Sequence, residues 1–162
     1  MDFPANNWLL KKRKALRGPV LVPAVDISVV SLLQALIPLA EQIIQCETPR
    51  RSQRRNAICI TRKIMVLSIF FEEVRDEGVA LFPSALLCLR ELYVVLQKAK
   101  YLLLDCSGDV SCAWLVMQTE EISNKFYVLM HDIAAALAVL MHDIAAIWGY
   151  RDGIWWTITT IE

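Results

Sequence analysis

The stretch PSALLCLRELYVVLQKAKYLLLD, residues 83–105, has the most regular hydrophobic pattern in the chain. Apolar residues return at alternating steps of four and three, at Ala85, Leu89, Leu92, Leu96, Ala99 and Leu103. Because an α-helix turns once every 3.6 residues, these side chains share one face. Pro83 and Ser84 are favourable at a helix start, and the DCSGD sequence at 105–109 predicts a break. This stretch therefore predicts a helix with one buried stripe.

Segments on both sides of this stretch show the same helical spacing. A first helix is expected after Asp26, a good N-cap residue, with a kink at Pro38. A second is expected from Ser52 to Glu77, with Gly78 ending it, and a fourth from near Ser111. The stripes of the first, second and fourth helices are Val29, Leu32, Leu33, Leu36, Leu39, Ile43 and Ile44; Ile60, Ile64, Leu67, Phe71 and Val74; and Leu115, Ile122, Phe126, Leu129, Ile133, Leu137 and Leu140.

Four amphipathic segments with short links predict an all-α fold, an antiparallel four-helix bundle over residues 26–140. The chain of 162 residues is 56% hydrophobic with only 5 glycines, which also favours packed helices. Residues 1–25 are predicted to be a flexible, disordered basic leader, since they combine a basic run with three prolines. Residues 141–162 are an atypical tail, because IWGYRDGIWWTITTIE at its end has no helical period.

Charge is distributed unevenly along a chain whose formal net charge is zero. Residues 1–63 hold 11 Lys and Arg against 4 Asp and Glu, and the rest holds 6 against 13. We predict partner binding at Arg50, Arg51, Arg54 and Arg55, and a nuclear import signal at Lys11, Lys12, Arg13 and Lys14. The alternative for both clusters is a solvated surface. Aromatic residues are not interleaved with these charges, so nucleic-acid binding is not expected.

The two histidines, His131 and His142, occupy the same position in two copies of LMHDIAA, 11 residues apart. That offset is about three helical turns, or roughly 16 Å, too far for one metal ion or one catalytic dyad. Five cysteines without CxxC spacing indicate reduced thiols in a cytoplasmic or nuclear compartment. No nucleotide-binding or hydrolase motif occurs. We therefore predict no catalytic, metal-binding or cofactor-binding residues.

Membrane association is kept as an alternative. Charged residues such as Asp132 and Asp143 interrupt the apolar stretches, and a span takes roughly 20 apolar residues. No spanning helix is therefore expected. A basic leader next to apolar helices is nevertheless compatible with a membrane-associated helical-bundle module, of the architecture seen in some plant immune proteins.

Three motifs in order resemble the N-terminal domain of plant ubiquitin ligases of the U-box plus armadillo type. They are RKIMVLSIFFEEVRDEG, with its FFEEV core at residues 70–74; ALLCLRELY at residues 85–93; and WLVMQTEEISNKFYVLMHDIAAAL. The resemblance covers roughly residues 26–140. In that family a glutamine-aspartate often stands at the position of His131-Asp132, a further reason to expect no special role for His131.

The resemblance implies an interaction and regulatory domain in protein ubiquitination and in stress and immune signalling. It implies protein partners: a kinase, an exocyst-type protein or a second copy of the chain. In the family, the U-box that recruits the conjugating enzyme follows this domain, and we expect this chain to end before it. Ubiquitin transfer would then belong to the family and not to this chain alone.

Overall fold

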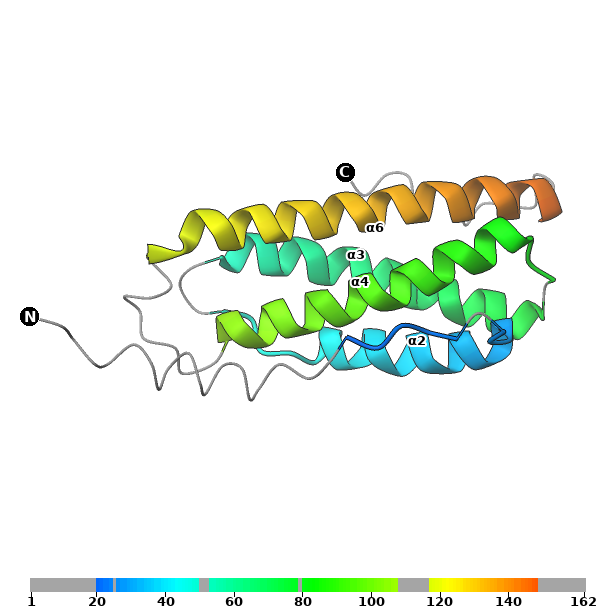
Figure 1. The fold of residues 1–162 in the computed structure, drawn as a ribbon, viewed down its shortest axis with the longest axis horizontal. Helices are drawn as coiled ribbons and strands as arrows, with labels where there is room; N and C mark the ends of the chain where they lie inside the picture. The colour runs from blue at the N-terminus through cyan, green and yellow to red at the C-terminus, as the bar shows by residue number, and fades with distance from the viewer. Residues whose placement is uncertain (1–19, 25, 50–52, 79, 108–116, 149–162) are drawn as a thin grey trace, which may run out of the picture.

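The computed structural model describes residues 20–24, 26–49, 53–78, 80–107 and 117–148. Its elements are the helices α2 (Val29–Ile44), α3 (Arg54–Glu77), α4 (Pro83–Ser107) and α6 (Thr119–Trp148). Consecutive helices run in opposite directions along a common long axis (Figure 1). The predicted all-α class and antiparallel four-helix bundle are therefore confirmed.

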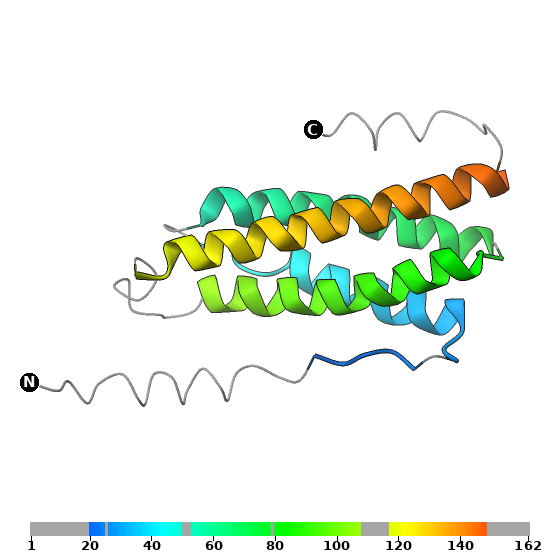
Figure 2. The same cartoon turned by 45° about the horizontal axis from the view of Figure 1, so that its top comes forward.

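The four helices form a square rather than a row. α2 packs against α3 and α4, and α6 packs against the same two helices. The consecutive helices α3 and α4 are therefore diagonal partners, as the turned view also shows (Figure 2). Each helix buries one stripe toward the centre of this square.

Helix α2 begins two residues later than the sequence predicted. Ser28, not Asp26, is the N-cap: its backbone is extended, and its Oγ accepts a hydrogen bond from the Ser31 N–H at 3.2 Å. Both residue types cap helices well, so the choice depends on where the backbone turns. Pro38 lies within α2, and the kink expected there stays a prediction.

The predicted buried stripes of α3 and α4 are confirmed. Every stripe residue of these two helices is at most 2% exposed, and Phe71 is the largest among them. α3 ends at Gly78, which adopts the left-handed conformation with φ 60°. A residue without Cβ takes this conformation freely, which explains the glycine.

Helix α6 is the longest element. Its start was predicted near Ser111, but residues 108–116, with stripe residue Leu115, lie outside the described residues. α6 continues unbroken past residue 140, where the sequence placed the end of the bundle, and Ile144 is fully buried. Residues 149–162 of the predicted tail are likewise outside the described part. Helix α6 therefore contains the whole second LMHDIAA copy, residues 140–146.

Residues 20–24 form an extended segment, here called the strap, that lies along α4 (Figure 2). The Gln97 side chain accepts a hydrogen bond from the Leu21 N–H at 2.9 Å and donates one to the Leu21 carbonyl at 2.7 Å. Arg90 Nη2 donates to the Pro23 carbonyl at 3.0 Å. The strap lies inside the predicted flexible leader, residues 1–25, whose flexibility stays a prediction. Residues 1–19 lie outside the described chain.

One described helical segment, Thr119–Ala145, is long and apolar enough to cross a membrane by length and composition. Its most apolar window has a mean hydropathy of 1.6, and 22% of that window is buried in the bundle. No span was expected from the sequence, because Asp132 and Asp143 interrupt the apolar stretch. A window with these two aspartates is still apolar on average, so one segment is a candidate by composition, and the expectation of no span stays a prediction.

Two leucines two positions apart test the packing of α4. Leu89 is 0% exposed and Leu87 is 53% exposed. Leu89→Ala should lower the free energy of unfolding by about 2–5 kcal/mol, since it removes buried methyl groups and leaves a cavity. Leu87→Ala, the matched control, should change it by less than about 1 kcal/mol. Urea unfolding followed by circular dichroism measures both, and equal losses would contradict the assigned buried face.

Candidate functional site: the basic start of helix α3

The candidate site is the first turn of α3, where two of the four predicted arginines are described. Arg54 and Arg55 are the first two helical residues and both are exposed. Arg50 and Arg51 lie outside the described residues, as do Lys11, Lys12, Arg13 and Lys14. The structure thus places half of the predicted arginine cluster together on one exposed turn.

A small polar network fixes this turn against α6. Gln53, the residue before α3, has a left-handed backbone with φ 64°. Its Nε2 donates to the Thr119 carbonyl at 3.0 Å, and Asn56 Nδ2 donates to Gln53 Oε1 at 2.6 Å. Asn56 Nδ2 also lies 3.5 Å from Ser123 Oγ on α6. The base of the arginine-bearing turn is thereby attached to a second helix.

The positive charges on this turn are unfavourable for the stability of α3. The N-terminus of a helix carries a partial positive charge, so acidic residues are favourable there and basic ones are not. The first turn of α3 has no acidic residue, and Gln53 makes no side-chain cap bond. Among the described residues neither Arg54 nor Arg55 has an ion-pair partner. Helix stability therefore does not explain these arginines.

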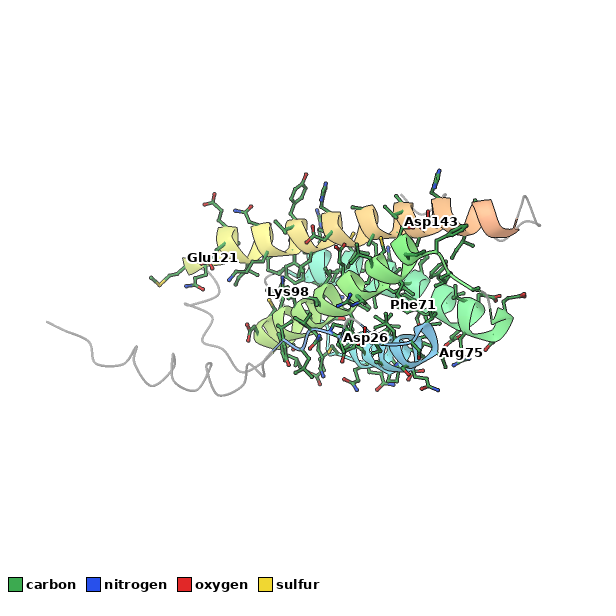
Figure 3. All side chains as sticks on the ribbon, turned by 45° about the vertical axis from the view of Figure 1, so that its right-hand side comes forward. Asp26, Phe71, Arg75, Lys98, Glu121 and Asp143 are labelled. Atoms are coloured by element: carbon green, nitrogen blue, oxygen red, sulfur yellow. The ribbon has the colours of Figure 1, made fainter. Side chains whose placement is uncertain are left out.

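Both histidines lie on the solvent-facing side of α6. The side chains of His131 and His142 are 72% and 86% exposed. Each Nδ1 lies 3.6–3.9 Å from a carboxylate oxygen of the following aspartate. Asp143 instead accepts a hydrogen bond from the Ser84 hydroxyl at the start of α4, and Figure 3 shows it on α6 near that end of the bundle. Within the described residues no group of three or more potential ligands could hold a metal ion.

The described cysteines differ in exposure, and burial raises the thiol pKa of two of them. Cys88 and Cys106 are buried, Cys46 is partly buried and Cys59 is exposed. Burial, reinforced by the nearby Glu91 and Asp143 carboxylates, raises the pKa of the Cys88 thiol. Burial also raises the pKa of Cys46, with Lys100 opposing it. Since the thiolate is the nucleophile, a raised pKa argues against catalysis by either residue.

Two outward-facing grooves follow the seam between α4 and α6. The larger, about 500 Å³, lies near the start of α6, where Figure 3 labels Lys98 and Glu121. The smaller, about 420 Å³, lies farther along the same seam and is lined by Cys88, Glu91, Val95, Asp132 and Val139 among others. Sequence reasoning missed these grooves, because a helical period identifies the buried stripe and not the shape of the flanks.

Sequence reasoning also missed Gln97 and Arg90, which hold the strap. Gln97 is 6% exposed, one of the few buried polar residues among the described ones. Gln97 follows the stripe residue Leu96 in the sequence and therefore lies on the flank of the buried stripe. A polar residue at that position was the signal in the sequence that could have identified it. The third groove, of about 350 Å³ between α2 and α4, also includes Gln97 in its wall.

The described chain is an all-α helical-bundle domain, and comparison with known proteins places it among plant proteins. It is 34% identical over 107 residues to U-box domain-containing protein 1 of Medicago truncatula, covering 66% of this chain and 15% of that protein. It is 33% identical over 130 residues to U-box domain-containing protein 19 of Arabidopsis thaliana, covering 77% and 19%. It is 31% identical over 146 residues to U-box domain-containing protein 17 of Arabidopsis thaliana, covering 79% and 20%.

These matches confirm the resemblance read from the motifs. The chain corresponds to a region of a plant U-box protein, and it spans a fifth or less of the length of these three relatives. No protein-family profile matches the chain. No solved structure matches it either.

Reversing a charge at the start of α3 should stabilise the bundle. Arg54→Glu places a carboxylate on the positive end of the helix and should raise the free energy of unfolding by about 0.3–1 kcal/mol at low salt. Arg62→Glu, an exposed mid-helix control, should have little effect. Urea unfolding at low salt and at 1 M NaCl measures the difference, which should shrink with salt because exposed charges are screened. A destabilised Arg54→Glu variant would show that the arginine contributes to folding.

Proposed function

We propose that this bundle is a protein–protein interaction and regulatory domain of a plant U-box ubiquitin ligase that acts in protein ubiquitination and signalling. The similarity to plant U-box proteins supports the ligase context. The observation that carries the interaction role is the unpaired, exposed Arg54 and Arg55 on a turn that is fastened to α6. Ubiquitin transfer is proposed for the whole protein and not for this bundle.

The proposed partner presents an acidic protein surface. Two exposed guanidinium groups on a fixed turn offer donors in a defined direction, and Arg50 and Arg51 precede them in the sequence. A kinase, an exocyst-type protein and a second copy of the chain are the candidate partners. The proposed location is the cytoplasm, with nuclear import through Lys11, Lys12, Arg13 and Lys14.

Alanine at the four arginines should weaken partner binding without unfolding the bundle. The full chain and its Arg50→Ala/Arg51→Ala/Arg54→Ala/Arg55→Ala variant are used as bait in plant extract, and proteins lost with the variant are identified. The affinity of one such protein, purified, should fall at least tenfold and lose most of its salt dependence. An Arg62→Ala/Lys63→Ala variant, changed further along α3, is the control.

The same set of variants shows what would contradict the proposal. Unchanged affinity in the quadruple variant, with circular dichroism and thermal unfolding as in the wild type, would remove the arginines from the interface. Equal losses in the control variant would indicate a general charge effect and not a site on the first turn of α3.

Membrane association is the second candidate, and one observation favours it. The segment Thr119–Ala145 is apolar on average but mostly unburied, and Tyr127, Val128 and Val139 are 69%, 54% and 41% exposed on it. His131 and Asp132 are exposed on the same helix, which opposes insertion in this folded form. A bundle whose apolar residues serve protein contacts should remain in solution.

Vesicle flotation separates the two candidates. The full chain, mixed with phosphatidylserine-containing vesicles in a density gradient, should stay in the protein fraction at physiological salt. Recovery with the vesicles at high salt as well would indicate apolar insertion, and Val128→Lys should then reduce it. That outcome would replace the interaction proposal by the membrane candidate.

A further inference from the structure

We propose that the face of α4 that carries Gln97 and Arg90 is a binding site for an extended peptide, which the strap occupies in the isolated chain. The partner is a segment of another protein with the same chemistry: extended backbone, apolar side chains and a proline two residues after the residue bound by Gln97. This site lies on α4, away from the arginines of α3, and goes beyond the proposed function.

The hydrogen-bond pattern matches one edge of an extended chain. In extended backbone the N–H and carbonyl of one residue point to the same side, and those of the residue two positions on do too. Gln97 bonds both groups of Leu21, and Arg90 bonds the carbonyl of Pro23. Proline has no N–H, so its carbonyl is the one group on that edge that needs a partner. A glutamine and an arginine therefore satisfy this edge completely.

The spacing gives the bound peptide a direction. Gln97 and Arg90 are seven residues apart, about 10 Å along the helix axis. Leu21 and Pro23 are about 7 Å apart in extended backbone. The long side chain of Arg90 spans the difference of about 3 Å between this distance and the separation of the two α4 residues. Leu21 pairs with the later helix residue and Pro23 with the earlier one. A partner segment would run antiparallel to α4.

The centre of the strap is held mainly by its backbone. Leu21 is 59% exposed and Val22 is 74% exposed. Val20 is more buried, at 36% exposed, and lines the groove between α4 and α6. The positions of Leu21 and Val22 should therefore accept other side chains, while an apolar residue is favoured at the position of Val20. Gln97 and Arg90 on α4 thus bond main-chain groups that any extended peptide presents.

The polar groups of the site favour exchange of one peptide for another. The Gln97 amide is buried with the strap in place, and its Nε2 also donates to the Tyr93 carbonyl at 3.3 Å. Arg90 Nε is also buried and has no hydrogen-bond partner among the described residues. The strap therefore leaves the Arg90 Nε donor unused, and a different extended peptide that bonds this donor would gain one contact over the strap. A competing peptide restores the lost bonds as the strap departs.

A free peptide must compete with the strap, which is part of the same chain. A covalently attached segment acts at an effective concentration of about millimolar, so the wild-type chain should bind a free peptide weakly. Leu21→Pro removes the N–H that bonds Gln97 and should weaken the strap. Val22→Pro removes an N–H that points to the other edge of the extended chain and is the matched control.

The probe is a fluorescein-labelled peptide with the sequence of residues 18–26, titrated into the full-length variants and followed by fluorescence anisotropy. The Leu21→Pro chain should bind it about fivefold more tightly than the Val22→Pro chain, as expected for loss of one hydrogen bond from the tethered competitor. Adding Gln97→Leu to the Leu21→Pro chain should weaken binding at least tenfold, whereas adding Glu91→Ala, an exposed residue of α4 in the groove that the strap does not line, should not.

Three outcomes would overturn the inference. One is the absence of saturable binding to a folded Leu21→Pro chain, which would make the strap a fixed part of the fold. Another is equal binding with and without Gln97→Leu. The third is a concentration-dependent dimer of the wild-type chain, measured by sedimentation and lost in the Gln97→Leu variant, which would make a second copy the occupant. A Leu21→Pro version of the peptide should bind more weakly than a Val22→Pro version, and the reverse order would contradict the assigned edge.

Discussion

The buried stripe of α4 is the constraint on which the other elements depend. α4 contacts both α2 and α6, and its stripe from Ala85 to Leu103 is fully or almost fully buried between them. Burying a leucine side chain is worth about 1.5–3 kcal/mol, so this one face supplies a large share of the packing energy. Because the stripe turns inward, the flanks of α4 face outward. One flank carries Gln97 and Arg90 against the strap, and the other forms the grooves shared with α6.

The first turn of α3 shows a conflict between local stability and placement of charge. Arg54 and Arg55 stand where the helix dipole disfavours them, and Gln53 holds a left-handed backbone that side chains with a Cβ rarely adopt. The turn is nevertheless fastened by the Gln53 and Asn56 amides to α6. The amides of Gln53 and Asn56 therefore hold a locally unfavourable turn in a fixed position.

Periodicity predicted the interior of this molecule and little of its exterior. The stripes of α3 and α4 could be read from the sequence because burial on one helical face requires apolar residues at steps of three and four. The cap of α2 could not, since Asp26 and Ser28 are both good caps and the backbone turn selects between them. The strap was assigned to a flexible leader because residues 1–25 combine a basic run with three prolines. Its contacts with Gln97 join residues 76 positions apart, which no local pattern contains.

The repeated phrase LMHDIAA is explained by helix geometry rather than by chemistry. Eleven residues make about three turns, so a second copy returns each side chain to nearly the same face. Ile133 and Ile144 are accordingly 1% and 0% exposed, and both histidines face solvent. The two aspartates differ: Asp132 is exposed, while Asp143 accepts a hydrogen bond from Ser84 at the start of α4. The repeat therefore lengthens α6 in register, and its second aspartate ties that extension to the helix on which the bundle depends.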